Sequence, residues 1–316
     1  MAEEKLESQA AGAVTEESSD FAALLKQEFR PKSDRIESEI NAAVETLAEH
    51  VLKDTNLVSE DAVTSIQAMI AQIDAKLAEQ VNKIIHHADY QKIESAWRGL
   101  SYMVNNTETD DTLKIKVMNI SKDELAKTLK KFKGTAWDQS PIFKRVYEEE
   151  YGQFGGEPFG CLVGDYEFDH SPPDVELLGE MSAVAAASHT PFLAASKPTV
   201  MNMDSWQELA DPRDLTKIFQ TPEYAAWRSL RESDDARYIG LAMPRFLARL
   251  PYGAETDPVE EFDFEEDTES ASHDRYTWAN AAYAMAVNIN TAFKLYGWCT
   301  QIRGIESGGA VEGLPT

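Results

Sequence analysis

The stretch Phe159-Gly-Cys-Leu-Val-Gly-Asp-Tyr-Glu-Phe168 is typical of a buried strand that becomes half exposed, because its apolar run gives way to alternation. Pro172-Pro173-Asp174 starts a helix that continues to about Ser188, and a second strand follows at 191–196. A strand, a helix and a strand within about 38 residues form a crossover unit. Such units join parallel strands, so the sequence predicts a parallel pair.

The segments after this unit alternate between short helices and strands. Helices are expected near 211–219 and 222–232, and a strand at 237–243. A long apolar helix is expected from about Tyr276 to Cys299. Together with the crossover unit, these elements predict a mixed α/β domain.

Before this unit, the spacing of apolar residues changes from helical to alternating at 113–117. Leu113, Ile115 and Val117 alternate with lysines, which predicts a half-buried strand. An amphipathic helix is expected from Ser121 to Phe132, and residues 141–151 have a helical composition.

The N-terminal third is predicted to be helical. Apolar residues recur at helical spacing over 36–51, 59–84 and 90–104. Ile93, Trp97 and Leu100 share one face of the third helix. The expected fold class is therefore α+β, and the expected division is a disordered leader with a short helix (1–32), a helical region (33–108) and a mixed α/β domain (109–316).

The short helix in the leader has one apolar face. Phe21, Leu24, Leu25 and Phe29 are spaced for a single helical stripe, and Pro31 ends it. A helix of about ten residues is marginally stable alone. It is either a frayed helix docked on its own domain or a linear motif that enters a groove of a partner.

The charge balance excludes two classes of partner. The 316 residues carry a net charge of −25, of which residues 1–20 contribute −5 and residues 254–274 contribute −10. Nucleic acids and anionic membrane surfaces bind basic proteins, so neither is an expected partner. Cys161 and Cys299 make no disulfide framework, and no signal peptide or membrane span is present, so a cytoplasmic protein is expected.

A search for catalytic and metal-binding motifs finds little. There is no phosphate-binding glycine loop, nucleophile elbow or zinc motif, and neither a cofactor nor a metal is expected. Asp165, Glu167 and His170, with Asp169 between them, could form an acid–base cluster at a strand end, which leaves a cytosolic hydrolase as the alternative function.

Two further polar features have simpler explanations. His86 and His87 lie at a helix junction, where adjacent side chains point about 100° apart, so a solvated cap is expected rather than joint metal ligation. The acidic stretch 254–274 lacks calcium-loop spacing and is expected to be a solvated loop. Alternatively, its two phenylalanines anchor it to a neighbouring subunit.

Three stretches resemble signatures of one family, the large subunit of the type VI secretion contractile sheath (TssC/VipB). They are His87–Leu100 (HADYQKIESAWRGL), Arg237–Gly253 (RYIGLAMPRFLARLPYG) and Tyr296–Pro315 (YGWCTQIRGIESGGAVEGLP). The three occur in the family's order, and the resemblance spans about 33–316.

This resemblance implies a structural protein, not an enzyme, with a domain like those of contractile tail sheaths. It implies partners: a small sheath subunit (TssB/VipA type), inner-tube Hcp-type hexamers, a baseplate and further copies in a helical polymer linked by donated strands. It also implies that a ClpV-type AAA+ ATPase recognises an N-terminal helix, with Phe21, Leu24 and Leu25 as anchors. Family chains continue past a segment like 311–315, so a C-terminal part is expected to be missing after Thr316.

Overall fold

A three-stranded parallel sheet organises the larger of the two units into which the chain divides. The computed structural model describes residue 42 and residues 62–210, 214–268 and 273–315. The larger unit comprises 83–257 and 266–316; the smaller one comprises the residues up to Asn82 and the segment 258–265.

The crossover predicted from the sequence is confirmed. β1 (Leu162–Phe168), β2 (Phe192–Ser196) and β3 (Ile239–Ala242) are parallel and lie in the order β1-β2-β3. α8 (Pro172–Ala187) connects β1 to β2. Every residue of β2 is buried, because this central strand is covered on both faces.

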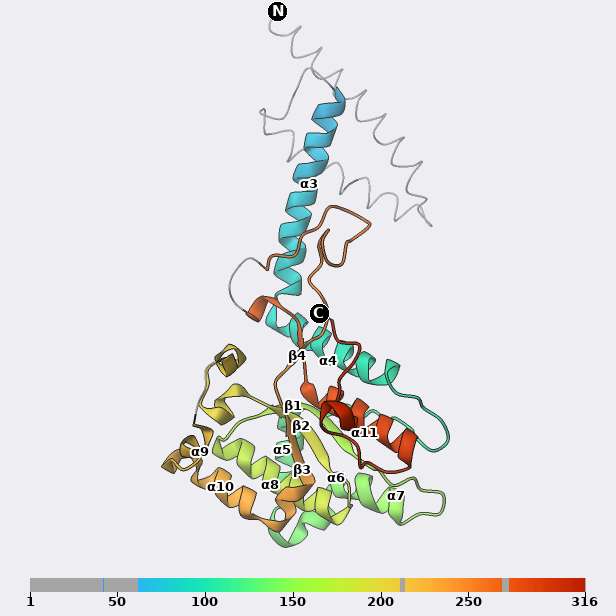
Figure 1. Ribbon diagram of the computed structural model, residues 1–316, viewed down its shortest axis with the longest axis vertical. Helices are drawn as coiled ribbons and strands as arrows, with labels where there is room; N and C mark the ends of the chain where they lie inside the picture. Colours follow the sequence, from blue (N-terminus) through green and yellow to red (C-terminus); the bar gives the residue numbers. More distant parts are fainter. Residues whose placement is uncertain (1–41, 43–61, 211–213, 269–272, 316) are drawn as a thin grey trace, which may run out of the picture. The chain divides into compact units, whose positions relative to one another are not determined.

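One face of the sheet is covered by α8, α5 (Lys122–Lys131) and α10 (Ala225–Glu232) (Figure 1). Their apolar side chains share a core with Phe168 of β1 and Phe192 of β2. This core is the largest apolar cluster of the described residues, and it fixes the sheet against the α8 layer.

The opposite face of the sheet is covered by α11 (Ala281–Tyr296), and α4 (Ala88–Asn105) packs on α11 (Figure 1). A second, smaller apolar cluster lies between this face of the sheet and the two helices. Val163 contacts it, because the side chains of β1 alternate between the two faces of the sheet. Tyr283 of α11 and Met103 of α4 are buried at its centre. The sheet is thus the middle layer between two helical layers.

The remaining described elements are shorter or peripheral. They are α3 (Ala62–Ile85), α6 (Pro141–Phe143) and α7 (Glu149–Tyr151) joined by a π-helical turn (Lys144–Glu148), α9 (Leu215–Ile218), β4 (Phe246–Leu247), β5 (Trp278–Ala279), and 3-10 turns at Gly134–Gln139, Pro198–Met201, Trp206–Ala210, Pro222–Tyr224, Asp234–Tyr238, His273–Arg275 and Ile305–Ser307.

Helix ends follow the capping residues of the sequence. Ser121 and Glu124 form a reciprocal capping box at the start of α5, with N···O distances of 3.2 and 3.0 Å. Asn280 caps α11 by accepting a hydrogen bond from Ala282 N, and Gly297, with φ of +77°, ends that helix.

Two sequence predictions about secondary structure are wrong. The segment 113–117 forms no strand: it pairs with none of the described strands, and its Lys114 and Lys116 bond Glu157 and Glu150 instead. The C-terminal helix begins at Ala281 rather than near Tyr276, because Trp278 and Ala279 pair antiparallel with Leu247 and Phe246.

The predicted α+β class, a helical N-terminal region followed by mixed α/β structure, is confirmed. The division at residues 32 and 108 stays a prediction.

Candidate functional site

In the described part of the chain, both lateral edges of the sheet lack a strand partner. Among the described residues, β1 and β3 each pair with β2 alone, so neither outer edge carries a strand partner. The backbone groups on such edges can accept an added strand from another chain or segment. The fold therefore presents two places where assembly by strand addition is chemically possible.

The irregular part of β1 is bonded by a side chain from another element. The register of β1 against β2 is irregular between Val163 and Glu167. Near this point Asn280 Nδ2 lies 3.4 Å from Gly164 O and 3.2 Å from Tyr166 O. Asn280 thus satisfies strand carbonyls while it caps α11, which joins the sheet to the helix on its second face.

A buried charge network lies beside this layer, centred on Arg249. Arg249 Nε donates to Glu94 Oε1 at 2.7 Å, and its two terminal nitrogens donate to Glu266 at 2.5 and 3.1 Å. Only 5% of the Arg249 side chain, 9% of Glu94 and 1% of Glu266 are exposed. The guanidinium therefore connects α4, the segment after β4 and the acidic stretch.

Further side chains complete this Arg249 network. Glu94 also accepts from Arg98 and from Thr277, and Tyr252 N donates to Glu266 at 2.9 Å. Burial disfavours the charged form of Arg249, but the hydrogen bonds of Glu266 and Glu94 outweigh it and raise its pKa. Burial likewise acts to raise the pKa of Glu94, yet Arg249 and Arg98 together lower it. Both residues are therefore held in their charged forms.

The two adjacent histidines have different environments. His87 is exposed, and its Nδ1 accepts from Asp89 N at the start of α4, so the predicted solvated cap is confirmed for this residue. The prediction is wrong for His86, which is buried in the network. Arg275 lies 3.1 Å from His86 Nδ1, and Glu266 lies 3.2 Å from Nε2. This arrangement requires a proton on Nε2.

The acidic stretch is not a wholly solvated loop as predicted. Glu266 is held by Arg249, and Phe264 is only 4% exposed and contacts Phe262 with ring centroids 5.5 Å apart. Because Phe264 is buried within its own chain, it is not a free anchor for a neighbouring subunit. Asp257, Glu260 and Glu261 remain exposed, as expected.

The predicted acid–base cluster does not assemble. Asp165 and Glu167 share one face of β1, and the pKa of Asp165 is raised because neighbouring groups displace water and Glu167 adds like charge, although Asn280 opposes this. His170 instead stacks on Tyr224, a residue of the α8-side core, at 4.2 Å. Its buried Nδ1 has no hydrogen-bond partner among the described residues. Asp169 is bound by Ser171 N and Lys197.

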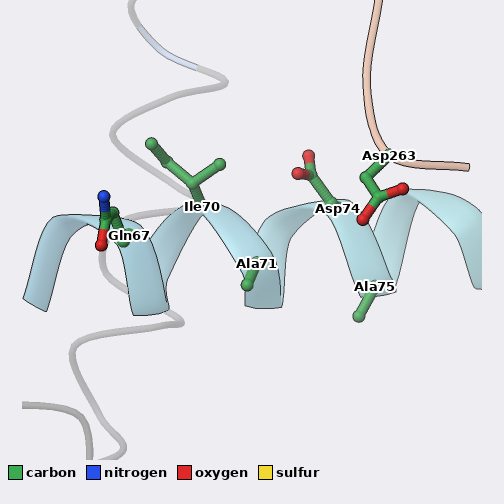
Figure 2. A pocket seen from close by; sticks show the side chains of 6 residues that line it. All are labelled: Gln67, Ile70, Ala71, Asp74, Ala75 and Asp263. Carbon is green, nitrogen blue, oxygen red and sulfur yellow. The ribbon is translucent and has the colours of Figure 1, made fainter. Parts of the chain in front are cut away.

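Neither a surface hollow nor a group of metal-ligating side chains gives the described residues another candidate for a catalytic site. A hollow of about 320 Å³ lies on α3 (Figure 2), lined by Gln67, Ile70, Ala71, Asp74, Ala75 and Asp263. It contains none of the cluster residues and no nucleophile. The described part of the chain brings no three metal-ligating side chains together. None of its helices combines the length and apolar composition that crossing a bilayer requires.

The Arg249 network was not predicted from the sequence. The signal was an arginine in the apolar run Phe246-Leu-Ala-Arg-Leu-Pro-Tyr252, where burial demands carboxylate partners. The predicted partner-binding residues Phe21, Leu24 and Leu25 lie outside the described residues.

Comparison with known proteins gives two matches. The family model VipB, described as "EvpB/VC_A0108, tail sheath N-terminal domain", matches residues 67–316. The chain is 70% identical over all of its 316 residues to the type VI secretion system sheath protein TssC1 of Pseudomonas aeruginosa. It spans 64% of the length of that relative. The matched region includes the sheet, both helical layers and the Arg249 network, so the chain belongs to the TssC/VipB family of tail sheath proteins.

Proposed function

We propose that this chain is a structural subunit of a type VI secretion contractile sheath. It co-assembles with a small sheath subunit into a helical polymer around an inner tube, and contraction of the polymer propels the tube. The observation that carries the proposal is a sheet whose two edges have no strand partner among the described residues, in a chain of the tail sheath family.

The open edges fit an assembly that changes shape. A strand added to β1 or β3 is held by backbone hydrogen bonds, which do not depend on the side chains of either partner. The segment that carries the added strand can bend while those hydrogen bonds persist. Subunits linked in this way keep their connection as the polymer shortens.

The proposal extends to the partners and the compartment. The tube consists of Hcp-type hexamers, the sheath starts from a baseplate, and assembly takes place in the cytoplasm. The protein has no enzymatic role in this scheme, which agrees with the separation of His170 from Asp165. A ClpV-type ATPase recovers subunits from the contracted sheath through Phe21, Leu24 and Leu25 of the leader.

The test is co-expression of the tagged chain with a small sheath subunit. We expect the two proteins to copurify and to form tubules in negative-stain images, whereas the chain expressed alone forms none. Failure of the unaltered chain to copurify with the small subunit would overturn the proposal.

A further inference from the structure

The turn between α3 and α4 carries a histidine whose two ring nitrogens bind groups of opposite charge. His86 Nε2 lies 3.2 Å from Glu266 Oε1, and Arg275 Nη1 lies 3.1 Å from His86 Nδ1. Only 7% of the His86 side chain and 1% of the Glu266 side chain are exposed, so water does not readily replace either partner. The two contacts therefore decide where the imidazole carries its proton.

Each contact assigns one ring nitrogen of His86. A carboxylate only accepts hydrogen bonds, so Nε2 carries the proton that Glu266 accepts. A guanidinium only donates hydrogen bonds, so Nδ1 offers its lone pair to Arg275. His86 is thus held as a neutral imidazole, and the lone pair of Nδ1 is the place where a second proton binds. That proton and Arg275 compete for the same lone pair.

Of the two partners, Arg275 is the one that can leave. Glu266 also accepts hydrogen bonds from both terminal nitrogens of Arg249, and its bond with Nε2 strengthens when the imidazole gains a positive charge. The Arg275 side chain, in contrast, is 40% exposed, and Asp267 lies 3.5 Å from it as an alternative partner. Water and Asp267 can therefore solvate the guanidinium once it has left the histidine.

The elements around His86 carry further charged and titratable groups. They are Lys83 of α3, His87 of the same turn, Glu94 of α4, Arg249 after β4, Glu266 and Asp267 of the acidic stretch, and His273, Asp274 and Arg275 of the 3-10 turn before β5. Burial acts to raise the pKa of Glu94, but Arg249 and Arg98 lower it, so this carboxylate keeps its charge in weakly acidic solution. Between pH 8 and pH 5.5 the side chain that ordinarily changes its charge is histidine. A pH response in this range therefore has three candidate origins, namely His86, His87 and His273.

We infer that protonation of His86 detaches the turn His273–Arg275 from the junction of α3 and α4. In the neutral state, Arg275 anchors the turn by donating to Nδ1. In the protonated state, Nδ1–H faces the guanidinium, and two donors cannot share a hydrogen bond, so Arg275 leaves. The turn then depends on Gln91 of α4, whose Nε2 donates to Asp274 O at 2.9 Å. This conformational step goes beyond the proposed function and does not rest on it.

The test is hydrogen–deuterium exchange of the purified chain at pH 8 and pH 5.5, with mass spectrometry of a peptide that covers 273–280. The rates are corrected for the intrinsic effect of pH on exchange. We expect the corrected rate to be roughly fivefold higher at pH 5.5, because a hydrogen bond that anchors the turn is lost. His86→Gln is expected to abolish this response, because its amide offers a donor and an acceptor but binds no proton in this range.

Matched variants separate His86 from the other two histidines. His87→Asn, which keeps a capping side chain at the start of α4, and His273→Asn are both expected to retain the pH response. Arg275→Gln removes the anchor itself and is expected to exchange fast at both pH values, which tests the inference even if His86→Gln does not fold. Equal corrected rates of the wild type at both pH values would overturn the inference. So would a pH response that persists in His86→Gln or disappears in His273→Asn, or slow exchange of Arg275→Gln at pH 8.

Discussion

Arg249 and Glu266 form a bidentate ion pair, with donor–acceptor distances of 2.5 and 3.1 Å and almost no solvent exposure of either side chain. The two residues are 17 positions apart, and the part of the acidic stretch from 254 to 265 lies between them. The pair therefore closes this stretch into a loop whose end is fixed against α4 through Glu94. The most acidic part of the chain thus contains a carboxylate, Glu266, that is bound by a buried cation.

We predict that Arg249→Met strongly destabilises the larger unit. The substitution leaves Glu266 and Glu94 buried without their principal cation, which costs about 3–5 kcal/mol of unfolding free energy. Urea unfolding followed by circular dichroism measures this cost. Adding Glu266→Gln to Arg249→Met removes one of the unpaired charges, so the double variant is expected to be less destabilised than the sum of the single variants.

The control for this prediction is an exposed ion pair. Lys133 Nζ lies 2.6 Å from Glu176 Oε1, but both side chains are substantially exposed to water. Lys133→Met is therefore expected to leave the unfolding midpoint unchanged. Equal effects of Arg249→Met and Lys133→Met would contradict the view that the buried network holds the loop.

Two glycines in helices predict opposite responses to alanine. A Cβ at Gly99 would lie 2.5 Å from the ring of Tyr283, whereas a Cβ at Gly179 would meet only Leu230 at 3.8 Å. Gly99→Ala is expected to cost about 1–3 kcal/mol because α4 must move away from α11. Gly179→Ala is expected to stabilise by about 0.5–1 kcal/mol through helix propensity. Thermal unfolding of both variants decides, and a shift of the same sign in each would refute the packing argument.

The carboxylate of Asp169 predicts a pH-dependent stability. Partial burial acts to raise its pKa, but hydrogen bonds from Ser171 and the ion pair with Lys197 lower it to about 2. A lowered pKa in the folded state stabilises the fold above the unfolded value near 4, and this contribution is lost as the pH falls towards 2. Asp169→Asn is thus expected to cost about 1 kcal/mol at pH 6, after allowance for solvent screening, and almost nothing near pH 2.

Unfolding free energies of the wild type and Asp169→Asn between pH 6 and pH 2 test this expectation. Lys197→Met, which removes the partner cation at 3.1 Å, should lose its effect over the same range. A difference between Asp169→Asn and the wild type that does not change with pH would exclude this origin.

Elements that are determined by neighbouring residues in the sequence could be predicted from it. The strand–helix–strand unit of β1, α8 and β2 follows from its apolar runs and from the prolines at the start of α8. The alternation at 113–117 misled because alternation does not supply a neighbouring strand, and here the lysines pair with carboxylates instead. Likewise, Trp278 and Ala279 were assigned to a helix because their pairing with β4 depends on residues some 30 positions earlier.

The candidate sites likewise differ in whether their residues are close in the sequence or are brought together only by the fold. The cluster of Asp165, Glu167 and His170 looked plausible because its residues are close in sequence. Asp165 and Glu167 do share one face of β1, but His170 follows the strand and stacks on Tyr224 of the α8-side core. The Arg249 network bonds residues up to 189 positions apart, and no spacing rule predicts such a set. The exposure of Trp97 was equally hidden, because an apolar helix face indicates burial without naming the molecule that buries it.

The leader of the chain carries the last prediction, which concerns recovery of subunits after contraction. If Phe21, Leu24 and Leu25 enter a groove of a ClpV-type ATPase, Leu25→Asp places a charge in an apolar contact and is expected to reduce binding at least tenfold. Ala23→Asp introduces the same charge on the opposite side of the expected helix and is the matched control. Binding of a fluorescent peptide covering 16–31 to the ATPase measures both variants, and ATP-dependent disassembly of contracted sheaths measures the consequence. If Leu25→Asp leaves binding and disassembly unchanged, or if Ala23→Asp impairs them equally, the apolar face of Phe21, Leu24 and Leu25 does not mediate recognition.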